Sequence, residues 1–121
     1  MLENKSVLIV EDEFLIGQLL HDMLGELDCR SITYSSDLSR ALHALSKSRP
    51  DLAIIDLNLD GQSAVPLAVK LRDEQIPFII SSGYAPKSLD PEWQLYPILT
   101  KPFLLEALQN KISQALALNK L

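Results

Sequence analysis

Short apolar runs alternate with amphipathic stretches along this chain of 121 residues, and this alternation restricts its fold more than any other feature. Residues 6–10 (SVLIV) form a continuous apolar run, rich in β-branched side chains and flanked by polar residues. Such a run is typical of a strand buried on both faces. Similar runs predict further strands at residues 31–34, 52–55, 78–80 and 96–100.

Four stretches with helical spacing separate or follow the predicted strands. Apolar side chains recur there at intervals of three and four residues, over residues 14–27, 38–45, 63–71 and 104–116. Ser36 and Asp37 are candidate N-caps of the second helix.

The stretch from residue 84 to residue 95 lacks such a pattern. It contains Pro86 and Pro91 around a short KSLD piece, which limits any helix there to about one turn. We therefore expect the fourth helix to be short or irregular and this stretch to be the most mobile part of the chain.

Strands that alternate with helices predict an α/β fold with a doubly wound, five-stranded parallel sheet and helices on both faces. The length fits a single domain over residues 1–121, without a second DNA-binding or catalytic module. In such sheets, polar residues at the carboxyl ends of the strands face one crevice where ligands bind. This edge is the expected location of a functional site.

The charge balance restricts the partners. The chain carries 11 basic and 16 acidic residues, a formal net charge of −5, which disfavours broad binding to nucleic acid or to anionic membranes. Its one cysteine, Cys29, cannot form an internal disulfide, and no run approaches the roughly 18 apolar residues of a membrane helix. The first residues do not resemble a signal peptide. We expect a soluble, cytoplasmic protein.

Reactive side chains follow four of the predicted strands. Glu11 and Asp12 follow the first strand, Asp56 the third, Ser82 the fourth and Lys101 the fifth. Carboxylates in one crevice would repel one another, each close pair by about 4 kcal/mol at about 4 Å and an effective dielectric of about 20, so a cation is required. Lys101 supplies one positive charge. Ligands that are all oxygen favour a hard ion, Mg²⁺.

Each of these residues also has an ordinary structural explanation. Glu11 and Asp12 could cap a helix, and Asp56 could be an exposed turn residue. Lys101 could be a solvated charge and Ser82 a turn residue. Because all of them coincide with strand ends, a shared site is favoured over these separate explanations.

Together these segments resemble the receiver domain of bacterial two-component response regulators. The matching pieces are VLIVEDE at 7–13, DLAIIDLNL at 51–59, PFIISSG at 77–83 and KPF at 101–103. The resemblance extends from about residue 5 to residue 117. It implies a stand-alone, CheY-like receiver with no output domain and a flavodoxin-like sheet in the strand order 2-1-3-4-5.

The resemblance implies a role for each residue at the strand ends. Asp56 is expected to accept a phosphoryl group from a phosphohistidine on a sensor histidine kinase or a phosphotransfer protein. Asp12, Asp56 and the backbone carbonyl of Asn58 are expected to hold Mg²⁺, with Glu11 acting through a bound water. Lys101 is expected to pair with a phosphoryl oxygen.

The resemblance also implies a hydroxyl switch. Ser82 is expected to turn toward the phosphoryl group and to repack a protein-binding surface for a downstream target. The bond between Lys101 and Pro102 is expected to be cis, which would help to aim the lysine. Receivers usually carry Tyr or Phe three residues before this lysine, where the chain has Ile98, so Tyr84 is a candidate substitute for the aromatic switch.

Other positions depart from the usual receiver pattern, and some of them resemble one subset of receivers. Asp60 stands where a proline is usual, and Ala64 where a glycine is usual. PF at 77–78 and SGY at 82–84 resemble a subset of alphaproteobacterial stand-alone receivers that pair with HWE-class histidine kinases. Asn58 and the tyrosine of SGY occupy the positions that tune the lifetime of the phosphoryl group in receivers.

Three functions remain open from the sequence. The first is a phosphoacceptor switch, a monomer or weak dimer that binds proteins and is not an enzyme on other substrates. The second is a receiver-like interaction module that works without phosphate, which the aliphatic Ile98 keeps open. The third is a small Mg²⁺-dependent phosphohydrolase with an aspartate nucleophile. Haloacid-dehalogenase-type enzymes need a second acid two residues after the nucleophile, where this chain has Asn58.

Overall fold

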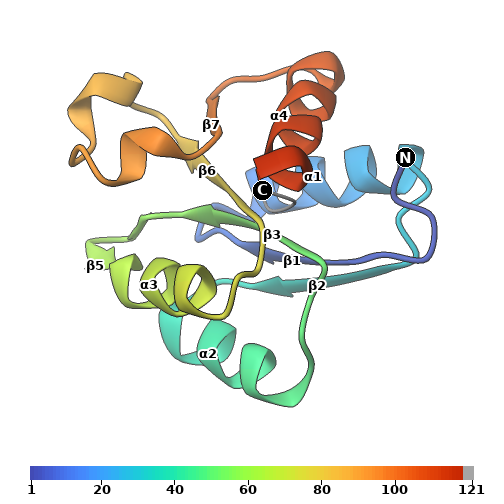
Figure 1. Cartoon of the computed structure of the whole chain (residues 1–121), viewed down its shortest axis with the longest axis horizontal. Coiled ribbons are helices and arrows are strands. Elements are labelled where there is room, and N and C mark those ends of the chain that lie inside the picture. Colours follow the sequence, from blue (N-terminus) through green and yellow to red (C-terminus); the bar gives the residue numbers. More distant parts are fainter. Residues whose placement is uncertain (119–121) are drawn as a thin grey trace.

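A five-stranded parallel sheet forms the centre of the molecule (Figure 1). The computed structural model describes residues 1–118. The strands of this sheet are β1 (Ser6–Val10), β2 (Ser31–Ser35), β3 (Leu52–Asp56), β6 (Phe78–Ser82) and β7 (Ile98–Thr100). They lie in the order β2-β1-β3-β6-β7, and every neighbouring pair is parallel. Counted along the chain, this is the predicted order 2-1-3-4-5.

Two helices cover each face of the sheet, which confirms the doubly wound α/β class. α1 (Phe14–Glu26) and α4 (Leu105–Leu118) pack on one face. α2 (Leu38–Lys47) and α3 (Val65–Asp73) pack on the other (Figure 1). Within residues 1–118, no helix is long and apolar enough to cross a membrane.

The central strand β1 is apolar from Val7 to Val10 because it lies between two cores. In β1, Val7 and Ile9 pack toward α1 and α4, whereas Leu8 and Val10 pack toward α2 and α3. Successive side chains of a strand point to opposite faces, so a strand that is covered on both sides has apolar residues at every position. The first charged side chain after β1 is that of Glu11, at the carboxyl edge of the sheet.

A small hairpin between β3 and α3 was not predicted. Asn58–Leu59 (β4) pairs antiparallel with Gln62–Ser63 (β5), and Asp60 and Gly61 at the turn have φ angles of 52° and 89°. Positive φ at both central positions is the geometry of a two-residue hairpin turn, which Asp-Gly favours. Because the hairpin takes up Ser63, the third helix begins at Val65, later than expected.

The last strand and the last helix also begin later than predicted. β7 begins at Ile98 rather than at residue 96, and Tyr96 instead stacks on Phe78 with ring centroids 4.3 Å apart. α4 begins at Leu105, and the preceding Leu104 is 78% exposed instead of packing in the core.

The stretch before β7 contains two single-turn 3₁₀ helices, η1 (Pro86–Ser88) and η2 (Trp93–Leu95), which confirms the short, irregular fourth helix. Most of its side chains are exposed, but Trp93 is buried and packs against Phe78 and Tyr96. The guanidinium carbon of Arg72 lies 5.8 Å from the centroid of the Trp93 ring. Trp93 therefore anchors this stretch to α3 and β6. The mobility of residues 84–95 stays a prediction.

Replacing this anchor should destabilise the domain. We expect Trp93→Ala to lower the free energy of unfolding by about 3 kcal/mol, because it removes a large buried side chain from the core. Leu95→Ala is the matched control, since Leu95 belongs to the same short helix and is 79% exposed, and should change stability by less than about 0.5 kcal/mol. Urea unfolding measures both. Equal effects of the two substitutions would contradict the anchoring role.

Candidate functional site

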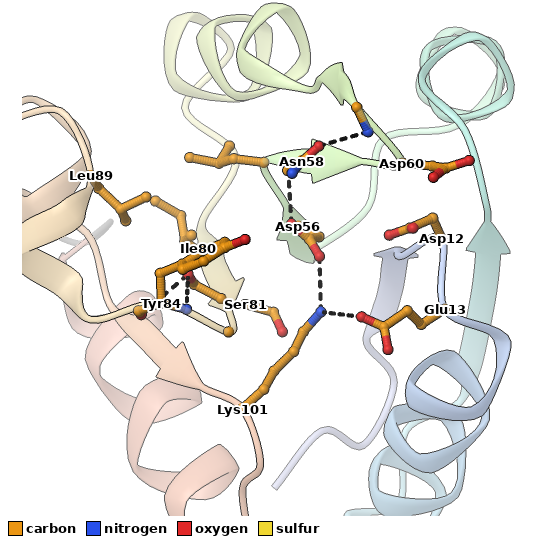
Figure 2. Close-up of a pocket in the computed structure, with 14 residues that line it drawn as sticks. Asp12, Glu13, Asp56, Asn58, Asp60, Ile80, Ser81, Tyr84, Leu89 and Lys101 are labelled. Atoms are coloured by element: carbon orange, nitrogen blue, oxygen red, sulfur yellow. Dashed lines mark hydrogen bonds and ion pairs between the residues drawn. The ribbon is translucent and has the colours of Figure 1, made fainter.

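The carboxyl edge of the sheet gathers the residues that the sequence singled out. Asp12, Asp56, Ser82 and Lys101 line a cavity of about 480 Å³ at this edge (Figure 2). Glu11 is 1% exposed and contacts Lys101, which lines the cavity. The parallel arrangement of β1, β3, β6 and β7 brings these residues together, because each lies at or just after the carboxyl end of its strand.

Lys101 is the cationic centre of this cluster. Its Nζ lies 2.7 Å from Oε1 of Glu11 and 2.8 Å from Oδ2 of Asp56. A third carboxylate, that of Glu13, lies 3.7 Å from the same nitrogen, and Figure 2 shows Lys101 pointing at Asp56 and Glu13. The lysine therefore offsets part of the repulsion that the sequence predicted among these acids.

Burial and pairing shift the ionisation of this cluster. Burial raises the pKa of Glu11 above its ordinary value, and the ion pair with Lys101 and the hydrogen bond from the amide of Glu13 oppose this shift. For Lys101, burial lowers the pKa, but the interactions with Asp56 and Glu11 outweigh it and raise the pKa. The lysine is therefore charged at neutral pH.

The acids have the geometry of a cation site. Glu11, Asp12 and Asp56 each offer a carboxylate oxygen, and these atoms all lie within 4.8 Å of one another. Clustered carboxylates suit a hard divalent cation such as Mg²⁺. The donor set therefore fits the ion that the sequence predicted.

Asn58 contributes to the site through its backbone. Its amide donates a hydrogen bond to Oδ1 of Asp56 at 2.8 Å. Its side-chain oxygen accepts a hydrogen bond from the amide of Gly61 at 2.9 Å, inside the hairpin turn. The side chain thus shapes the turn, while the backbone orients the carboxylate of Asp56.

The hydroxyl of Ser82 is held by its own turn. Its Oγ accepts a hydrogen bond from the amide of Tyr84 at 3.0 Å and donates to the carbonyl of Tyr84 at 3.3 Å. The amide of Lys101 donates to the carbonyl of Ser82 at 2.8 Å, which ties the two positions together. The side chain of Tyr84 is 68% exposed, and Ile98 is buried in the core. The bond between Lys101 and Pro102 is cis, as the resemblance implied.

Two residues of the site were missed from the sequence. Glu13 precedes α1 and has the charge expected of a cap, but its side chain makes no cap hydrogen bond within the described residues and approaches Lys101 instead. Ser81 is buried beside Asp56 in the sheet register, and its hydroxyl has no hydrogen-bond partner among residues 1–118. The polar run at the end of β6 was the only signal for Ser81.

The ion pairs predict a pH-dependent effect of removing the lysine. Lys101→Met leaves Glu11 and Asp56 without their counter-ion, so we expect a loss of about 3 kcal/mol in the free energy of unfolding at pH 8. The loss should shrink toward pH 5. An acid whose pKa is raised on folding binds more protons in the folded state, so stability falls as pH rises above the ordinary value of 4.5 and recovers on acidification.

Lys70→Met is the matched control for this measurement. Lys70 forms an exposed pair with Glu74 at 3.1 Å on α3, and such pairs contribute less than about 0.5 kcal/mol. Urea unfolding between pH 5 and pH 8 compares the two variants, with magnesium withheld by a chelator. A Lys101→Met effect that is constant with pH would contradict the proposed charge balance.

Comparison with known proteins places these features in a family. The response regulator receiver domain family matches residues 7–113. Sporulation initiation phosphotransferase F of Bacillus subtilis (strain 168) is 27% identical over 120 residues, which are 95% of this chain and 96% of that protein. SdrG from Sphingomonas melonis Fr1 is 33% identical with a TM-score of 0.80, over 97% of each chain.

A further solved structure shares the fold over part of its length. The response regulator PhyR from Brucella abortus is 29% identical with a TM-score of 0.84, over 96% of this chain and 49% of that one. This chain therefore spans about half the length of PhyR. The family match, the sheet order and the acidic edge agree, and the chain belongs to the response regulator receiver domain family.

Proposed function

We propose that this chain is a phosphoacceptor switch in which Asp56 receives a phosphoryl group from a phosphohistidine of a sensor histidine kinase or phosphotransfer protein. The observation that carries this proposal is the position of Asp56, which faces the cavity between Lys101 and the carboxylates of Glu11 and Asp12. One oxygen is held by Lys101 and the other by the amide of Asn58, so the carboxylate has a fixed orientation.

In the proposed transfer, a carboxylate oxygen of Asp56 attacks phosphorus, the new O–P bond forms and the N–P bond to the donor histidine breaks. Asp12, Asp56 and the backbone carbonyl of Asn58 would hold Mg²⁺, with Glu11 acting through water. The metal would neutralise charge that develops on the phosphoryl oxygens. Lys101 would move from its carboxylate partners to one of these oxygens.

The same site would drive a conformational change. A phosphoryl group brings about −1.5 to −2 charges and acceptor oxygens to a cavity that Ser82 lines. The Ser82 hydroxyl would leave the backbone of Tyr84 and donate to a phosphoryl oxygen, which would release the turn at residues 82–84. Because Ile98 is aliphatic, Tyr84 would take the part of the usual aromatic residue in changing the protein-binding surface.

We propose protein partners on both sides of this switch. The name of the Bacillus subtilis relative, a phosphotransferase, supports transfer of phosphoryl groups between proteins. The net charge of −5 supports protein partners rather than nucleic acid or membrane. We further propose that it acts in the cytoplasm as a monomer or weak dimer, that it is not an enzyme on other substrates, and that it pairs with an HWE-class kinase. The SGY sequence at residues 82–84 is the basis for that pairing.

The two other functions have less support. A module that works without phosphate does not require the acidic cluster and its lysine, yet Glu11, Asp12, Asp56 and Lys101 lie together. A phosphohydrolase of the haloacid-dehalogenase type needs an acid where Asn58 already bonds the hairpin turn.

Phosphorylation in vitro tests the proposed function directly. Incubation with acetyl phosphate and Mg²⁺ should add one phosphoryl group per chain, measured by intact mass. Asp56→Asn should abolish the adduct, and Asp12→Asn should raise the Mg²⁺ concentration needed for it by at least about tenfold. Asp60→Asn is the control, because Asp60 lines the same cavity outside the acidic cluster, and should keep the adduct. An adduct that persists in Asp56→Asn would rule out the proposed acceptor.

The switch predicts a separation of phosphorylation from conformational change. Ser82→Ala should still gain the phosphoryl group at Asp56 but lose the shift at Tyr84 and β7, because the hydroxyl that links them is gone. Backbone NMR spectra with and without beryllofluoride measure the shift. Ser88→Ala, an exposed serine of the neighbouring stretch, should respond like the unmodified chain. Full retention of the shift in Ser82→Ala would contradict the proposed switch.

A further inference from the structure

An aromatic residue on the neighbouring strand bonds the acidic end of β1. The hydroxyl of Tyr34 donates a hydrogen bond to the backbone carbonyl of Glu11 at 2.6 Å. Tyr34 belongs to β2, the edge strand that supplies none of the site residues described above. In the β1–β2 register it lies opposite Ile9, so its side chain must reach past the end of β1 to meet Glu11.

A glycine on α1 makes room for this ring. Gly17 is buried, and a Cβ atom added to it would overlap with Cε1 of Tyr34 and crowd the neighbouring ring carbons. An alanine at this position therefore requires the ring to move. Since its φ angle is not in the left-handed region, Gly17 is needed for space rather than for backbone conformation. Gly17 and Tyr34 thus form one packing unit between α1 and β2.

β2 holds the Glu11 residue through both of its backbone groups. The Glu11 amide donates to the carbonyl of Ser35 at 3.1 Å, and the Glu11 carbonyl accepts from Tyr34. The next residue is Asp12, whose carboxylate belongs to the cluster with Glu11 and Asp56. Like charges this close repel one another and favour a turn that opens away from Asp56. The two backbone bonds oppose that opening.

We propose that Tyr34 is a positioning residue for the cation site: its hydroxyl holds the Glu11–Asp12 turn so that both carboxylates face Asp56. The inference rests on the proposed function only for the identity of the cation, Mg²⁺. In this role Tyr34 would contact neither the cation nor the phosphoryl group, because its hydroxyl bonds the carbonyl of Glu11. It acts through the peptide that carries two of the ligands, as residues outside the coordination sphere do when they orient metal ligands.

Magnesium affinity of the purified, unphosphorylated chain tests this role. Tyr34→Phe keeps the ring and removes the hydroxyl, so the Kd for Mg²⁺ measured by calorimetry should rise about three- to tenfold, the value of one hydrogen bond. Gly17→Ala should raise the Kd as well, because the ring is displaced. The Kd of the double variant should be at most about twofold higher than that of either single variant, since both substitutions remove the same contact.

Two controls make the outcome decisive. Tyr96→Phe also removes a phenolic hydroxyl, but the Tyr96 ring stacks on Phe78 away from the cluster. This substitution should leave the Kd for Mg²⁺ unchanged. Asp12→Asn should abolish measurable binding, which establishes that the titration reports this site. Urea unfolding without magnesium is measured in parallel, because a purely structural tyrosine would lower stability without changing the Kd.

The outcomes separate this inference from the proposed function. If the unaltered chain binds Mg²⁺, Asp12→Asn does not, and Tyr34→Phe binds like the unaltered chain, the role of Tyr34 is overturned and the phosphoacceptor proposal stands. If the unaltered chain does not bind Mg²⁺, both are overturned. A raised Kd in Tyr34→Phe and Gly17→Ala, with Tyr96→Phe unchanged, supports the inference.

Discussion

The ammonium group of Lys101 lies between the carboxylates of Glu11 and Asp56, and the rest of the site depends on this contact. Parallel strands place their carboxyl ends at one edge, so acids that follow different strands must meet there. Without a nearby cation, their repulsion would destabilise that edge of the sheet. The lysine permits the convergence, yet its single positive charge offsets only part of the negative charge of Glu11, Asp12 and Asp56.

The hydroxyl of Ser82 extends this balance to the neighbouring loop. The backbone carbonyl of Ser82 accepts a hydrogen bond from the amide of Lys101, while the Ser82 side chain bonds the backbone of Tyr84. Asp56, Lys101 and Ser82 are therefore linked within one hydrogen-bonded unit. Ile98 is a buried aliphatic residue, and the aromatic residue whose backbone Ser82 bonds is the exposed Tyr84.

The sheet and the acidic edge could be predicted from the sequence because both depend on local patterns. The run at residues 6–10 matches β1 in full, and Asp56 lies at the strand end where the alternation placed it. The hairpin of β4 and β5 was not predicted, because two-residue strands contain too few side chains to show a periodic pattern. The hydrogen bond from Tyr34 to Glu11 could not be predicted for another reason. It joins residues 23 apart in the chain, and only the sheet register brings them together.

The fit between Gly17 and Tyr34 also restricts how this chain can diverge. Enlarging residue 17 while the phenol ring remains creates a steric clash, whereas shrinking the ring first leaves space that a larger side chain can then fill. The order of the two changes therefore decides whether the intermediate contains this clash, so the effects of the two positions depend on each other. In sequences that diverge from this one, a larger side chain at residue 17 should occur together with a smaller side chain at residue 34.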